Sequence, residues 1–151
     1  MPRPVRAVAL TAGAVALSAL LTGCDKPTPK VTVLGGNRVV NITPSTYCWD
    51  AKHCPRSAQL DLPTVTVAAD EKVLIDVPRR VRSHGWQAQA LSLDGSKVLG
   101  TSGTIDDSHS YRVPSGINGG NAFIVQIDEL RKGKPDGSVW SFLVKVSLTA
   151  S

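Results

Sequence analysis

The sequence predicts an all-β domain, an immunoglobulin-like two-sheet sandwich of about seven strands behind a cleaved N-terminal signal. Short runs that alternate apolar and polar residues fill the chain beyond residue 30, and glycine, proline and aspartate separate them. No stretch after Cys24 has a helical period. A partly open β-barrel is the alternative arrangement. No cysteine pair is placed to link two sheets, so the likeness to antibody domains is one of architecture.

The expected strands are short and end at turn residues. Gly35-Gly36-Asn37 turns a first hairpin, and Asp94-Gly95 turns a later one. Two strands near the C-terminus show the strongest alternation, and residues 132–137 should join them as a long hairpin. The alternating runs from which about seven strands are expected lie at residues 30–34, 38–43, 64–68, 72–77, 85–93, 97–100, 108–113, 123–127 and 140–148.

The core should form between the two sheets from the apolar phase of these strands. Successive side chains of a strand point to opposite faces, so alternate apolar residues share one face. Trp86 is the expected centre of this core. The predicted core residues are Trp86, Phe123, Val125, Trp140, Phe142 and Val144.

The N-terminus has the layout of a lipoprotein export signal. Arg3 and Arg6 precede an uncharged apolar run that ends at Leu21-Thr22-Gly23-Cys24, which matches a lipobox. The run is shorter than the roughly 20 apolar residues of a membrane-spanning helix. A secretory signal that merely holds a cysteine is the alternative. The chain should divide into a signal peptide at residues 1–23, a lipidated tether at 24–30 and a β-sandwich domain at 31–151.

Acylation of the Cys24 thiol would place the domain at the cell membrane, on its extracytoplasmic side. Two acyl chains on one residue suffice for stable anchoring, whereas a single chain binds only marginally. Cleavage before Cys24 would lower the net charge from +5 to +3, since the mature chain keeps 15 basic and 12 acidic residues. So mild a balance argues against a nucleic-acid partner.

Cys48 and Cys54 remain once Cys24 is acylated, and we expect them to form a disulfide. Exported thiols tend to pair, and Asp50, Lys52 and Pro55 are consistent with a turn that closes the loop. A metal site at Cys48, His53 and Cys54 is the alternative. The adjacent His53 and Cys54 are awkward partners for one tetrahedral ion, and no fourth ligand is evident nearby.

The sequence offers few catalytic candidates. His53, His84 and His109 show no zinc-protease spacing. His109 lies beside Asp106, Asp107 and Ser108, but neighbours on a strand point to opposite faces and would not form a catalytic set. We therefore expect no enzyme, no cofactor and no metal site. The alternative is an envelope hydrolase or metal-dependent enzyme that uses His109 or His84.

Two basic clusters are expected in loops. Each basic side chain near an anionic surface contributes about 1 kcal/mol to binding, so these loops are the candidate contacts with anionic phospholipids or acidic wall polymers. Ordinary solvated loops are the alternative, because charged runs commonly serve solubility. The partner could also be another envelope protein. The clusters consist of Arg79, Arg80 and Arg82, and of Arg131, Lys132 and Lys134.

Four short segments of the chain stand out together. They are Cys24-Asp25-Lys26-Pro27-Thr28-Pro29, the valine strand at Val31 to Val33, Tyr47-Cys48-Trp49, and Gly137-Ser138-Val139-Trp140-Ser141-Phe142. On these segments the chain resembles small lipoproteins of actinobacteria that are grouped as a domain of unknown function. The resemblance covers nearly the whole mature chain and implies a β-rich lipoprotein without assigned enzymatic residues. It adds no molecular activity.

Overall fold

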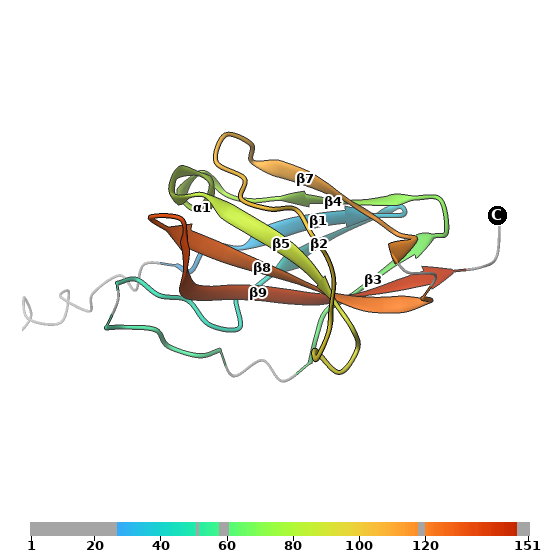
Figure 1. Ribbon diagram of the computed structural model, residues 1–151, viewed down its shortest axis with the longest axis horizontal. Helices are drawn as coiled ribbons and strands as arrows, with labels where there is room; N and C mark the ends of the chain where they lie inside the picture. Colours follow the sequence, from blue (N-terminus) through green and yellow to red (C-terminus); the bar gives the residue numbers. More distant parts are fainter. Residues whose placement is uncertain (1–26, 51, 58–60, 118–119, 148–151) are drawn as a thin grey trace, which may run out of the picture.

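Two β-sheets packed face to face make up the fold, which confirms the predicted sandwich (Figure 1). The computed structural model describes residues 27–50, 52–57, 61–117 and 120–147, so the predicted signal peptide and Cys24 lie outside it. Neither sheet closes into a barrel. The elements are β1 (Val31–Gly35), β2 (Arg38–Ile42), β3 (Thr64–Ala68), β4 (Lys72–Asp76), α1 (Arg79–His84), β5 (Trp86–Leu91), β6 (Val98–Thr101), β7 (Ser110–Pro114), β8 (Ala122–Arg131) and β9 (Lys134–Ser147).

The strand order follows the immunoglobulin plan. One sheet has the order β2-β1-β4-β7, and the other has the order β3-β9-β8-β5-β6. β4 and β7 take the places of strands B and E, while β5, β6, β8 and β9 take those of C, C′, F and G. The B–C and F–G connections of this plan lie at the same end of the sandwich.

One strand pair departs from the expected antiparallel pattern. β3 runs parallel to β9, with Val65 opposite Val144. β3 belongs to a different sheet from β2 and β4, because the irregular segment after β2 carries the chain across the sandwich. Parallel strands need a long connection, and the rest of the domain supplies one between β3 and β9.

The predicted core is confirmed. Trp86, Trp140 and the other four predicted core residues are each at most 1% exposed. Both indole N–H groups are satisfied, since Trp86 Nε1 donates to the Ser108 carbonyl at 2.9 Å and Trp140 Nε1 donates to the Pro29 carbonyl at 3.0 Å. The bond to Pro29 fixes part of the predicted tether on the domain.

The predicted long hairpin at residues 132–137 is wrong. β8 continues to Arg131 and β9 begins at Lys134, so only Lys132 and Gly133 form the turn. Both have positive φ, 55° and 73°, as the mirror-image turns of tight hairpins require. Pro135 and Gly137 looked like loop residues, but they lie in β9 opposite a register shift between Asp128 and Leu130.

The expectation of no helix after Cys24 is also wrong. α1 follows Pro78, buries Val81 and ends at Gly85, whose amide donates to the Arg82 carbonyl at 3.1 Å. Six residues are too few to show a helical period in the sequence. Gly85 has φ of 82°, and a Cβ there would lie 2.6 Å from Asp106 Oδ1, so the position favours glycine. No helix in the described ranges is long and apolar enough to cross a membrane.

Candidate functional site

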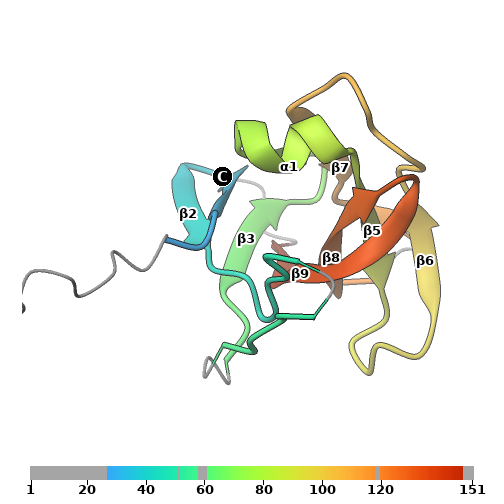
Figure 2. The same cartoon turned by 90° about the vertical axis from the view of Figure 1, so that its left-hand side faces the viewer.

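The two predicted basic clusters meet at one end of the sandwich. α1 forms the β4–β5 connection and Lys132-Gly133 forms the β8–β9 turn, which are the B–C and F–G connections of the immunoglobulin plan. The Leu130 amide donates to the Gly85 carbonyl at 2.8 Å and joins the two segments directly. Figure 2 looks onto this end of the molecule. We call it the basic end, and its exposed basic side chains are Lys30, Arg79, Arg82, Arg131, Lys132 and Lys134.

Arg80 differs from the other predicted contact residues because its side chain turns inward. Its guanidinium carbon lies 4.9 Å from the centre of the Trp49 ring and 5.7 Å from that of Tyr47. Cations attract the faces of aromatic rings at such distances, and desolvation strengthens the attraction. Arg80 therefore holds α1 against the aromatic residues of the cysteine loop and is half-buried, whereas Arg79 and Arg82 are exposed.

The aromatic residues beneath α1 form a stack that reaches the core. Tyr47 lies edge-on to Trp49 with ring centres 4.8 Å apart, and to Trp140 at 5.9 Å. Such pairs contribute about 0.5–1.5 kcal/mol beyond their buried area. The stack connects the basic end to the centre of the sandwich.

The predicted disulfide between Cys48 and Cys54 is confirmed and holds this loop in place. Cys48 is buried, and its amide donates to Ser138 Oγ of β9 at 2.9 Å. The bridge excludes the alternative metal site at these cysteines. No group of three or more histidine, cysteine or acidic residues is placed to hold a metal ion in the described part of the chain.

Glu129 is fully buried beneath the basic end, and its Oε1 is hydrogen-bonded to His84 Nδ1. Burial raises the pKa of the Glu129 carboxyl, the His84 hydrogen bond opposes this shift, and the nearby Asp136 charge adds to it. Sequence reasoning missed Glu129. It lies beside the register shift in β8, where strict alternation of buried and exposed positions fails.

Three buried polar atoms at this end make no hydrogen bond within the residues that the structure describes. They are Glu129 Oε2, Tyr47 Oη and Arg80 Nε. The three groups also interact through charge, since burial first and then the Glu129 carboxylate raise the pKa of Tyr47, whereas Arg80 lowers it. Buried polar groups in native proteins are mostly hydrogen-bonded to protein or to ordered water, so these three atoms mark the polar part of the basic end.

The remaining histidines form no catalytic set. His109 is 62% exposed, and its Nε2 lies 3.9 Å from Asp76 Oδ1. Ser108 Oγ donates instead to the Ser110 carbonyl at 2.8 Å. His53 is exposed in the cysteine loop, where its amide donates to Asp50 Oδ1.

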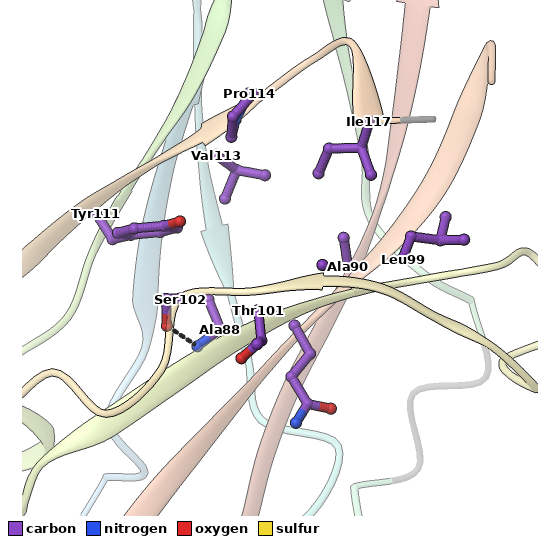
Figure 3. A pocket seen from close by; sticks show the side chains of 11 residues that line it. Ala88, Ala90, Leu99, Thr101, Ser102, Tyr111, Val113, Pro114 and Ile117 are labelled. Carbon is purple, nitrogen blue, oxygen red and sulfur yellow. Dashed lines mark hydrogen bonds between the residues drawn. The ribbon is translucent and has the colours of Figure 1, made fainter. Parts of the chain in front are cut away.

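A hollow lies between the sheets where β6 and β7 form their edges (Figure 3). It has a volume of about 190 Å³, and no charged side chain lines it. Ala88 and Ala90 face it from β5, at positions where other core strands carry larger residues. Leu99, Tyr111, Val113 and Ile117 form much of its wall. We call this hollow the β6–β7 cleft.

Sequence reasoning did not predict the cleft. Two alanines in succession on a core-facing strand were the available signal, because they leave volume that neighbouring side chains must fill. In other proteins an apolar cavity of roughly 150 Å³ takes up benzene. The cleft therefore has room for a ring-sized apolar group, but it offers no charge that would select a ligand.

Comparison with known families gives a match over the first part of the domain. The family described as "Protein of unknown function (DUF2771)" matches residues 24–114, more than half of the chain. The match includes the cysteine loop and α1, and it stops before β8 and β9. No curated protein matches the sequence.

Proposed function

Because this chain belongs to the DUF2771 family, whose function is unknown, we propose a role from its own residues. The protein is a lipid-anchored, non-enzymatic binding module of the cell envelope. Its basic end contacts an anionic envelope component on the extracytoplasmic side of the membrane.

The anchor rests on the N-terminal sequence. The lipobox at Leu21-Thr22-Gly23-Cys24 follows an uncharged apolar run, and the family match begins at Cys24 itself. The resemblance to actinobacterial lipoproteins also supports it. Replacing Cys24 with alanine should move the protein out of the membrane fraction. An unchanged fractionation, with no lipid on the intact wild-type mass, would contradict the anchor.

The convergence of two basic clusters, from separate parts of the chain, carries the binding proposal. α1 and the β8–β9 turn are held together by the bond between Leu130 and Gly85. Rigid scaffolds that present recognition residues on loops are common among immunoglobulin-like sandwiches, although the fold alone does not establish a function. Here the residues presented are cationic, which favours an anionic partner.

A charge-matched pair of variants tests this proposal. In the first, Arg79, Arg82, Lys132 and Lys134 are replaced with glutamine. In the second, four exposed basic residues outside the basic end, Lys72, Lys97, Arg112 and Lys145, are replaced in the same way. Both lose the same charge, so a general charge effect weakens both equally.

We expect only the first variant to lose salt-sensitive association with isolated envelope. Exposed charges are screened beyond about 10 Å at 0.1 M salt, so the association of the wild type should fall as salt increases. Circular dichroism and thermal melting check that both variants fold. Equal association of the two variants would remove the basic end from the proposal.

An envelope hydrolase that uses His84 is the second candidate. The observation that favours it is the hydrogen bond between His84 and the buried Glu129, because a carboxylate that orients an imidazole is part of a general-base arrangement. Hydrolysis of p-nitrophenyl acetate by the wild type, lost in His84→Gln, would favour this enzyme. Equal background rates in both proteins would favour the binding module.

A further inference from the structure

We infer that the basic end docks on the anionic surface of the membrane that holds the lipid anchor, so that the sandwich stands end-on to the bilayer. The inference rests on the proposed function for the anchor at Cys24. It adds the partner, the phosphate headgroups of anionic phospholipids, and it adds the orientation of the domain. Three features of the described structure carry it.

The first feature is the place where the chain enters the domain. Trp140 is fully buried, and its Nε1 donates to the Pro29 carbonyl at 3.0 Å, which fixes the chain just before β1. Figures 1 and 2 show this part of the chain at the same end as α1 and the β8–β9 turn. Pro27 is three positions from Cys24, and three residues span at most about 10–11 Å. An acylated Cys24 would therefore hold Pro27 at roughly one Debye length from the headgroups, and Pro27 enters the domain at the basic end.

The second feature is the balance of charge at this end. Asp136 is paired with Arg131 at 3.2 Å and is only 6% exposed, and Glu129 is fully buried, so neither presents a free negative charge. The exposed acids near this end are Asp50, Asp106 and Asp107. Asp76, at the end of β4, adds a carboxylate that is 46% exposed and lies 3.9 Å from His109 Nε2. Apart from Arg131, which is paired with Asp136, the exposed basic side chains still outnumber these acids. They are Lys30, Arg79, Arg82, Lys132 and Lys134. The end therefore complements an anionic surface.

The third feature is the absence of an apolar insertion surface. Among the described residues, the large apolar side chains that are exposed are Leu34, Val39, Leu62, Leu93 and Val98, and all lie outside the basic end. Contact with the bilayer would then be electrostatic, at headgroup depth. Such contact depends on lipid charge and on salt, and stable attachment still requires acyl chains.

The short reach of the chain favours a bilayer over a wall polymer as the partner. A polymer at a distance from the membrane would have to approach an end that the anchor already holds against the headgroups. Arg80 also favours a preformed surface, because its contact with Trp49 fixes α1 before any partner binds.

Lysine footprinting of the exported, full-length lipoprotein tests the inference. The protein is reconstituted into vesicles of neutral phosphatidylcholine, or of phosphatidylcholine with phosphatidylglycerol, and labelled with an amine-reactive reagent. Mass spectrometry first confirms the lipid on Cys24 and then compares labelling site by site. Lys30, Lys132 and Lys134 report on the basic end, whereas Lys72, Lys97 and Lys145 report on the rest of the domain.

We expect anionic vesicles to reduce labelling of Lys30, Lys132 and Lys134 several-fold, with Lys72, Lys97 and Lys145 unchanged. The protection should disappear in 1 M salt, where the Debye length is about 3 Å. Replacing Arg79 and Arg82 with glutamine should weaken it by roughly fivefold per residue. Replacing Lys72 and Arg112 instead should leave it intact.

Equal labelling in neutral and anionic vesicles would overturn the inference, as would protection centred on Lys97 or Lys145. If the charge-matched variants still differ in association with isolated envelope, such a result would point to a wall polymer or protein and leave the proposed binding function standing. A mass without lipid on Cys24 would overturn both the anchor and the docking that rests on it.

Discussion

The basic end and the β6–β7 cleft are packed differently. At the basic end the Tyr47 and Trp49 rings are in contact, and the Arg80 guanidinium lies over the Trp49 ring. In the cleft the small side chains of Ala88 and Ala90 leave a hollow of about 190 Å³. The first region contains buried charge and three unsatisfied polar atoms, and the second has no charged group in its lining. The basic end has many aromatic contacts, but it also buries charged and polar groups, which lowers stability. The cleft is electrostatically neutral but underpacked.

The two regions differ from an ordinary sandwich core in different ways, one in its packing and the other in its buried polar groups. Protein interiors are normally close-packed, with few voids and few unsatisfied polar groups. The cleft is an open hollow at the edge of this packing, and the basic end holds three buried polar atoms that have no partner among the described residues. A larger side chain in the cleft should therefore increase the free energy of unfolding, because it fills empty volume. A smaller side chain in the aromatic stack should decrease it, because buried contacts are lost.

Truncation of the aromatic stack should have the largest effect. Trp140→Ala removes a fully buried indole, its edge contact with Tyr47 and its bond to Pro29. Loss of a buried tryptophan typically costs about 3–5 kcal/mol. Urea unfolding measures this cost, with Val39→Ala as the control, since Val39 is 63% exposed. A free energy of unfolding close to the wild type's would show that the stack does not anchor the domain.

Removal of the disulfide should have a smaller effect. Cys48 and Cys54 are six residues apart, and so short a loop gives about 2 kcal/mol in the chain-entropy account. Replacing both with alanine should lower the melting temperature and increase the solvent exposure of Trp49 in fluorescence quenching. The cleft should be unaffected. An unchanged melting temperature would mean that Ser138 and the stack alone hold the cysteine loop.

Filling the cleft should change stability in the opposite direction. Ala90 is 5% exposed and lines the hollow, so Ala90→Leu places additional apolar volume in it. Substitutions that fill cavities commonly add about 0.5–2 kcal/mol. Ala69→Leu, at an exposed position outside the cleft, is the matched control. A loss of stability in Ala90→Leu alone would indicate that the cleft cannot accept a larger side chain.

The smallest expected effect is a change of stability with pH, which should come from the basic end and not from the cleft. Burial raises the pKa of Glu129 above its ordinary value, so the folded state retains a proton that the unfolded state has already lost. Stability should then decrease as pH rises from the ordinary glutamate pKa through the raised one. Glu129→Gln should flatten this part of the profile, whereas Ala90→Leu should shift the whole profile without changing its shape. An identical slope in wild type and Glu129→Gln would contradict the raised pKa.

Sequence periodicity predicted the sandwich core because alternation reports directly on which side of a strand is buried. The cysteine count predicted the disulfide, because only two thiols remain once Cys24 is acylated. Periodicity missed α1, which is shorter than two helical turns, and it misread Pro135 and Gly137 as loop residues although β9 includes them. It could not separate Arg80 from Arg79 and Arg82, since the direction of a side chain depends on the distant Trp49. The convergence of the two basic clusters depends on the sandwich topology, which no local pattern contains.

The central claim, that the two basic clusters act as one surface, is tested most directly by comparing each cluster alone with both together. One variant replaces Arg79 and Arg82 with glutamine, a second replaces Lys132 and Lys134, and a third combines all four changes. Association with the same isolated envelope is measured across a salt series. The account predicts that each pair weakens association and lowers its salt dependence, and that the combined variant is weakest. Association that depends on one pair and is indifferent to the other would contradict a single surface.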